Sequence, residues 1–143
     1  MANKKTKKSI EKIIFSGKRK TAVAKLRISA GDGKIFYNNL SHNELGLFHK
    51  LALSEPLRIC ILELGDNIKH DFHIRTSGGG REGQIQAARL AIARALLEIT
   101  GSDVLRKAYV KYDRNIIVPD SRRKETRKPG DSKARAKRQK SFR

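Results

Sequence analysis

The stretch SGGGREGQIQAARLAIARALLEIT, residues 77–100, decides the fold of this chain. It begins with three consecutive glycines and continues into a segment whose apolar residues recur at the spacing of a helix. Because a helix with one apolar face must be covered by another layer, the flanking segments are expected to build a sheet against it. The apolar residues of the stripe are Ile85, Ala88, Ile92, Ala95, Leu96 and Ile99, and Gly101 follows as a helix stop.

The glycines at 78–80 allow two interpretations. They form either a tight turn from a strand into the helix, or a site where backbone N–H groups at the helix start bind an RNA phosphate with help from Arg81. Glu82 weakens the second interpretation because it already offsets the helix dipole. A nucleotide-hydrolysing loop is disfavoured, since Gly83 is followed by Gln84-Ile85 in place of a Lys-Ser/Thr pair.

The segments before this stretch predict a sheet and a first helix. Residues 22–29 alternate apolar and polar side chains, and a glycine-rich turn leads to a second strand at 34–37, so the two are expected to form a hairpin. Ser41 predicts a capped helix that Pro56 closes. Two further strands are then expected to pair with each other, at 57–64 (with Cys60 in the core) and at 69–75.

Beyond the long helix, residues 104–112 predict a short helix and residues 116–118 an edge strand. The predicted fold class is therefore α+β, with helices on one face of a mainly antiparallel sheet. Charge divides the chain further into a basic N-terminal arm at 1–15, a globular domain at 16–118 and an extended basic C-terminal tail at 119–143.

The charge indicates a polyanionic partner. The chain has 33 Lys and Arg against 14 Asp and Glu, a net charge of +19, and a compact protein with this charge repels itself unless a polyanion neutralises it. Residues 119–143 hold eleven of the cations and too few apolar residues to fold alone. Three more cations, at 18–20, lie at the entry to the first predicted strand, where an ordered backbone favours phosphate binding. No pair of aromatics on adjacent strands is indicated, so recognition of RNA by shape and backbone is expected.

Other classes of protein are disfavoured. No apolar run approaches the roughly 18 residues of a membrane span, and the single cysteine excludes an internal disulfide. His70 and His73 are three residues apart on a predicted strand and face opposite sides, so no metal or other cofactor is expected. No Ser/His/Asp or Cys/His arrangement indicates an enzyme.

Four ordered motifs resemble one family. They are GKRKTAVAK at 17–25, SGGGREGQ at 77–84 with ARLAIARAL at 88–96, DSRRKE at 120–125 and QKSFR at 139–143. Together they resemble the ninth protein of the small ribosomal subunit, in its archaeal and eukaryotic branch. The resemblance implies the fold of the second domain of the fifth small-subunit protein, with a left-handed βαβ crossover.

The resemblance also implies a function. It predicts a cytoplasmic ribosomal protein, not a homo-oligomer, that binds small-subunit rRNA and neighbouring ribosomal proteins in the subunit head and extends its tail to the peptidyl-site tRNA. The residues assigned to tRNA are Lys140, Phe142 and Arg143. The residues assigned to rRNA are Lys18, Arg19, Lys20, Arg81, Arg122, Arg123, Lys124, Arg127, Lys128, Arg135, Lys137 and Arg138.

Two alternative hypotheses stay open at this point. A chromatin-type DNA-binding protein would be equally basic, and it would bind duplex DNA and RNA alike. A small-molecule kinase of the same broad fold, with a glycine-rich turn, would bind ATP. Neither accounts for a chain that finishes with an aromatic residue and a cation at 142–143.

Overall fold

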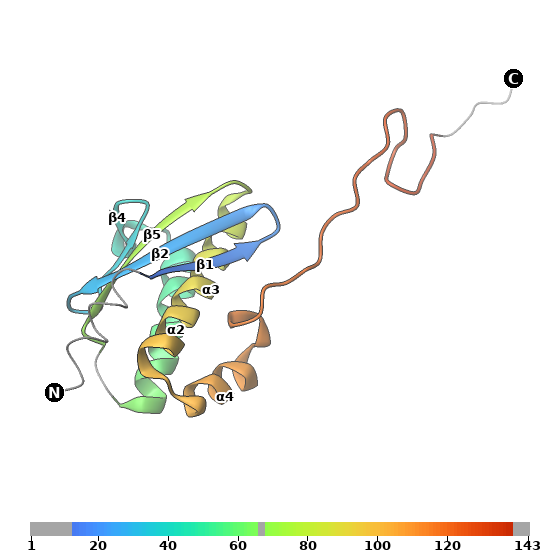
Figure 1. The fold of residues 1–143 in the computed structure, drawn as a ribbon. Coiled ribbons are helices and arrows are strands. Elements are labelled where there is room, and N and C mark those ends of the chain that lie inside the picture. Colours follow the sequence, from blue (N-terminus) through green and yellow to red (C-terminus); the bar gives the residue numbers. More distant parts are fainter. Residues whose placement is uncertain (1–12, 66–67, 139–143) are drawn as a thin grey trace, which may run out of the picture.

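The computed structural model describes residues 13–65 and 68–138, which form one five-stranded mixed sheet and three helices (Figure 1). All three helices lie on the same side of the sheet, which confirms the predicted α+β class. The strands are β1 (Ile14–Arg19), β2 (Ala22–Ala30), β3 (Ile35–Tyr37), β4 (Leu40–Ser41) and β5 (His70–Ser77). The helices are α2 (Leu47–Leu64), α3 (Arg81–Thr100) and α4 (Asp103–Tyr112), with 3-10 turns η1 (His42–Glu44) and η2 (Arg114–Ile116).

The strands lie in the order β1-β2-β5-β3-β4. Three of the neighbouring pairs are antiparallel, and only β3 and β5 run parallel. Parallel neighbouring strands require a crossover connection. The chain makes this connection through α2, which follows β3 and β4 in the sequence, lies on one face of the sheet and leads into β5. The chain therefore contains a βαβ unit, whose handedness stays a prediction.

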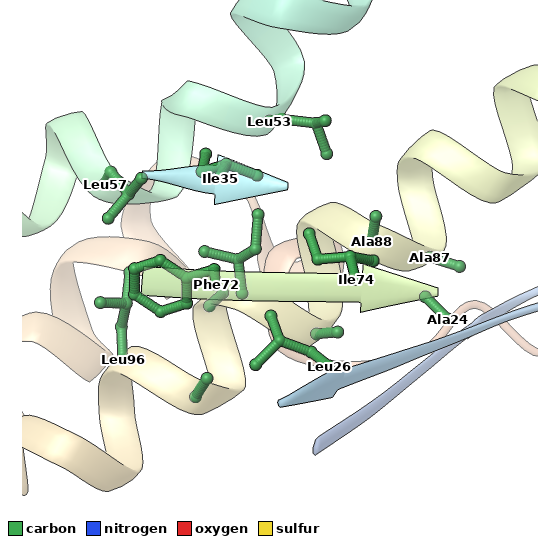
Figure 2. Close-up of a cluster of buried hydrophobic side chains, with 14 of the residues drawn as sticks. Ala24, Leu26, Ile35, Leu53, Leu57, Phe72, Ile74, Ala87, Ala88 and Leu96 are labelled. Carbon is green, nitrogen blue, oxygen red and sulfur yellow. The ribbon is translucent and has the colours of Figure 1, made fainter. Parts of the chain in front are cut away.

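The core lies between the sheet and α3. The alternation predicted for residues 22–29 is confirmed, because Ala22, Ala24, Leu26 and Ile28 are all buried. Figure 2 shows Phe72 and Ile74 of β5 beside Leu26, with side chains of α2 and α3 packed around them. The helical stripe of α3 is buried from Ile85 to Leu96, and Gly101 ends the helix in the left-handed conformation (φ 59°), as predicted.

One contact in this core brings two backbones together. A Cβ atom on Gly17 of β1 would lie 1.9 Å from the carbonyl oxygen of Ala87 and 3.0 Å from the nitrogen of Ala91, both in α3. Ala87 and Ala91 are fully buried. Small residues on both elements therefore allow β1 to rest directly on the helix.

The glycines between β5 and α3 form a tight turn. Gly78 and Gly79 have φ values of 72° and 64°, and a Cβ on either would lie within 3 Å of the backbone of Thr21 or Ala22. The tight-turn interpretation is confirmed, and close packing against the β1–β2 turn accounts for Gly78 and Gly79. A phosphate site at the start of α3 stays a prediction.

The hairpin expected between residues 22–29 and 34–37 is wrong. β5 lies between β2 and β3, and the other edge of β2 pairs with β1, a strand that the alternation did not indicate. The turn that follows β2 is held instead by β5, because the Asp71 carboxylate accepts hydrogen bonds from the backbone nitrogens of Asp32 and Lys34, both at 2.9 Å. The strand predicted at 69–75 exists, but β2 and β3 are its partners.

The strand predicted at 57–64 is also wrong, because α2 continues through Pro56 to Leu64. Leu53, Leu57 and Cys60 are buried at helical spacing, so the helix keeps its apolar face on the core beyond the proline. Cys60 is thus a core residue, as expected, but in a helix.

The Pro56 carbonyl accepts a hydrogen bond from the Tyr109 hydroxyl at 2.7 Å, and burial raises the pKa of Tyr109 so that this proton stays in place. Ser41, expected to begin the helix, caps η1 instead by accepting from the Asn43 nitrogen.

The third correction concerns residues 116–118, which form no strand. The Asp113 carboxylate accepts a hydrogen bond from the Asn115 nitrogen at 2.8 Å and starts η2, which buries Ile116. The short helix before it is confirmed, and Ser102 caps it. None of the helices in the described part of the chain is long and apolar enough to cross a membrane.

Replacing Gly17 with alanine should destabilise the domain by about 1–3 kcal/mol or more, because the new methyl group would overlap the Ala87 carbonyl. Chemical denaturation followed by circular dichroism measures the effect. Gly83→Ala is the matched control, since its Cβ would make only ordinary contacts at 3.4 and 3.6 Å. Equal stability of the two variants would contradict the proposed close packing.

Candidate nucleic-acid interface

The cations at 18–20 lie on a tight hairpin. β1 ends at Arg19 and β2 begins at Ala22, so Lys20 and Thr21 form the connecting turn, with Lys20 in the left-handed region at φ 53°. Lys18 and Lys20 are exposed, whereas Arg19 is half-buried. The first turn of α3, which carries exposed Arg81, packs against this hairpin, so these cations gather at one end of the domain.

Arg19 joins the hairpin to the start of the tail. Its guanidinium forms an ion pair with Asp120, which also accepts hydrogen bonds from Arg122 Nε and Nη2 at 3.0 and 2.8 Å and from the Arg122 backbone nitrogen at 2.8 Å. The hydrogen bonds from Arg122, and then that from Arg19, hold the pKa of Asp120 well below its usual value. Asp120 therefore stays ionised throughout the physiological pH range, and the attachment weakens only as the pH falls through this lowered pKa.

Two arginines of α3 fix the segment that leads into the tail. Arg94 donates to the carbonyl oxygens of Ser16 (2.9 Å) and Ile117 (3.1 Å), and so ties β1 to the chain just before the tail. Arg89 lies 2.6 Å from a carboxylate oxygen of Glu55 in α2 and 3.2 Å from one of Asp113 after α4.

The sequence interpretation assigned no function to Arg89 or Arg94. No local pattern could find these roles, because Glu55, Asp113, Ser16 and Ile117 are all more than 20 residues away from the arginine that they bind.

The tail has no helix or strand in its described part, residues 119–138, and it runs away from the domain (Figure 1). Residues 121–130 are all exposed. Arg135 pairs with Glu125 at 2.9 Å. The following cations are exposed and have no ion pair with any described carboxylate: Arg123, Lys124, Arg127, Lys128, Lys137 and Arg138. Lys140, Phe142 and Arg143, assigned to tRNA, lie outside the described residues.

The structure thus brings together some of the predicted RNA-binding residues and leaves others apart. Lys18 and Arg19 share a hollow of about 340 Å³ with Gln86, Pro119 and Asp120. The tail segment from Arg123 to Arg138, which carries the remaining described cations, runs away from the domain (Figure 1). In the part of the chain that is described, no cluster of His, Cys, Asp or Glu could hold a metal ion.

Comparison with known proteins gives the family. A model of the family described as ribosomal protein S9/S16 matches residues 17–143. The chain belongs to this family. Three similar proteins, each named small ribosomal subunit protein uS9, come from archaea.

The uS9 protein of Methanothrix thermoacetophila is 41% identical over 129 residues, covering 90% of this chain and 96% of its own length. That of Halobacterium salinarum is 41% identical over 132 residues, with coverage of 90% and 96%. That of Saccharolobus solfataricus is 42% identical over 132 residues, with coverage of 92% and 95%.

Membership of the S9/S16 family confirms the resemblance carried by the four motifs, and the archaeal relatives agree with the predicted branch. The family is structural and ribosomal, so the predicted role in translation and the prediction that the chain is not an enzyme are confirmed. The kinase hypothesis is therefore set aside. The predicted ribosomal location follows from the same finding.

Replacing Asp120 with asparagine should loosen the start of the tail and leave the domain folded. The measurement is hydrogen exchange of the Arg122 amide, whose N–H the Asp120 carboxylate accepts; exchange should become several-fold faster in the variant, with an unchanged melting temperature. The wild-type protection should be equal at pH 5 and pH 7, because Asp120 is ionised at both. Glu125→Gln, which removes only the exposed pair with Arg135, is the control. Equal exchange in both variants would refute the attachment.

Proposed function

We propose that this chain is a structural component of the small ribosomal subunit that binds rRNA through its hairpin and tail and reaches the peptidyl-site tRNA with its last residues. Its partners on this proposal are small-subunit rRNA, neighbouring proteins of the subunit head and the bound tRNA. The observation that carries the proposal is the described part of the tail, residues 119–138, in which exposed cations follow one another along a segment that has no helix or strand and is attached to the domain at Asp120.

Counterion release supplies the driving force for such a segment. The tail buries almost nothing against its own domain, so it gains no packing energy there. Each phosphate that a Lys or Arg neutralises frees condensed counterions, which favours binding to RNA of any sequence. Ala134 and Ala136 leave the backbone between these cations narrow, which suits a crevice between RNA strands.

The domain fixes the point from which the tail begins. Asp120 and Arg94 hold the first tail residues beside the hairpin, so the tail leaves the domain from a defined point. Lys18 and Lys20 at the same end would then bind rRNA phosphates near the tail's entry, on a backbone that is already ordered. Arg19 is already engaged with Asp120, so we assign it to positioning the tail as well as to rRNA.

The tip is assigned to tRNA. Arg143 offers a planar guanidinium that can bind two phosphate oxygens at once, which a lysine cannot do. Lys140 and Phe142 would support it by charge and by packing on a sugar or base. The resemblance to the ribosomal family is the support for this assignment.

The double variant Lys18→Gln/Lys20→Gln should weaken binding of the full chain to small-subunit rRNA. The slope of log affinity against log salt should fall by about 1 for each lost phosphate contact. Lys107→Gln/Lys111→Gln, which removes the same charge from exposed positions of α4, is the control and should change the slope less. Equal slopes for both variants would exclude the hairpin from the interface. Equally tight binding of the wild-type chain to duplex DNA would instead favour the chromatin-type alternative.

Deleting Ser141 to Arg143 should leave incorporation into the subunit unchanged and weaken tRNA binding at the peptidyl site. The reason is that the remaining tail cations still neutralise rRNA, while the terminal guanidinium is lost. Filter binding of tRNA to subunits that carry the truncated chain, at low magnesium concentration, measures the effect. Subunits with the substitution Arg123→Gln serve as the control for loss of one tail charge. Unchanged tRNA affinity in the truncated subunits would remove the tip from the tRNA site.

A further inference from the structure

No helix of the described residues covers the second face of the sheet (Figure 1). Residues paired directly across neighbouring strands place their side chains on the same face. Arg27 of β2 pairs with His73 of β5, and His73 pairs with Phe36 of β3. Two residues further along, Lys25 pairs with Arg75. Three strands therefore present cations and rings together on this open face.

The rings of Phe36 and His73 are stacked on each other. The Phe36 ring lies parallel to the His73 imidazole, with centroids 4.9 Å apart and an angle of 5° between the planes. The Ser29 hydroxyl lies 3.0 Å from His73 Nε2, which fixes the imidazole in this orientation. The sequence interpretation missed the pair because it considered only Phe and Tyr and did not expect β3 beside β5.

The cations around the stack are available to a ligand. Lys25, Arg27 and Arg75 are exposed, and none forms an ion pair or a side-chain hydrogen bond within residues 13–65 and 68–138. The carboxylate of Asp71, next along β5 on this face, is engaged by the backbone nitrogens of Asp32 and Lys34. The three cations and both rings line one hollow of about 690 Å³.

We propose that the open face of the sheet is a second RNA-binding surface, which takes an unpaired nucleotide of rRNA. The base extends the stack of Phe36 and His73, and the flanking phosphates bind Lys25, Arg27 and Arg75. This inference rests on the proposed function as an rRNA-binding protein, but it concerns a surface other than the hairpin and the tail.

The combination of groups favours RNA over other ligands. An acidic protein partner would neutralise the cations, but its carboxylates would make no contact that requires a stack of two flat rings. Duplex RNA offers phosphates, but its bases already stack on each other and are not free to contact a ring. An unpaired nucleotide satisfies both features, because it presents a free base face beside its phosphates.

Two kinds of variant in the full-length chain separate base stacking from phosphate binding. Phe36→Leu removes the ring without changing charge, so affinity for small-subunit rRNA should fall about 5- to 150-fold with the salt slope unchanged. Phe36→Tyr keeps the ring and should restore the affinity. Lys25→Gln/Arg27→Gln/Arg75→Gln should lower the salt slope by about 2, since each phosphate contact to a single strand contributes about 0.7. Arg106→Gln/Lys107→Gln/Lys111→Gln on α4 is the matched charge control and should lower it less.

Crosslinking in the assembled subunit identifies the occupant. A photoreactive residue in place of His73 should crosslink to an rRNA nucleotide, and that nucleotide should become chemically reactive in subunits that carry Phe36→Leu. Crosslinks to a protein, or an unchanged affinity and slope in both open-face variants while the wild-type chain still binds rRNA, would overturn this inference and leave the proposed function intact. A wild-type chain that does not bind rRNA would instead refute the proposed function.

Discussion

The contact between the backbones of β1 and α3 at Gly17 is the constraint on which the basic end of the molecule depends. Because no side chain separates the two elements there, β1 can rest on the helix and the turn at Lys20 lies beside the first turn of α3. Arg94 can then reach the carbonyl of Ser16 on β1 and, with the same guanidinium, that of Ile117. Through these bonds the position of the first strand also sets the point from which the tail departs.

Three arginines of this chain serve contacts inside the folded domain. Arg19, Arg89 and Arg94 are half-buried and bound to carboxylates or carbonyls, as the cost of removing a guanidinium from water requires. Several of the few acids, among them Glu55, Asp113 and Asp120, serve these internal contacts. Their use inside the scaffold leaves the hairpin, the tail and the open sheet face with a net positive charge. A basic protein of this kind can therefore be both well folded and strongly attractive to a polyanion.

The domain and the tail differ in how much apolar surface they can bury. The domain buries a core of apolar residues between one sheet face and its helices. The tail has too few apolar residues to build a core of its own. In its described part it is attached to the domain at Asp120, and its further contacts are internal to the tail, such as the ion pair between Arg135 and Glu125.

Local sequence patterns were sufficient for α3, β2 and α4, because helical period, alternation and caps act over a few residues. The turn at 114–116 was missed although its cap is local, since the Asp113 carboxylate accepts from the Asn115 nitrogen two residues away. The tertiary structure alone decided the order of the strands and the passage of α2 through Pro56. In both cases the deciding partner is distant in the sequence: β5 inserts between β2 and β3, and Tyr109 binds the carbonyl of Pro56. The same holds for the candidate sites. Charge indicated the hairpin and tail cations, whereas the stack of Phe36 on His73 and the roles of Arg19, Arg89 and Arg94 exist only because folding brings together residues that no local pattern connects.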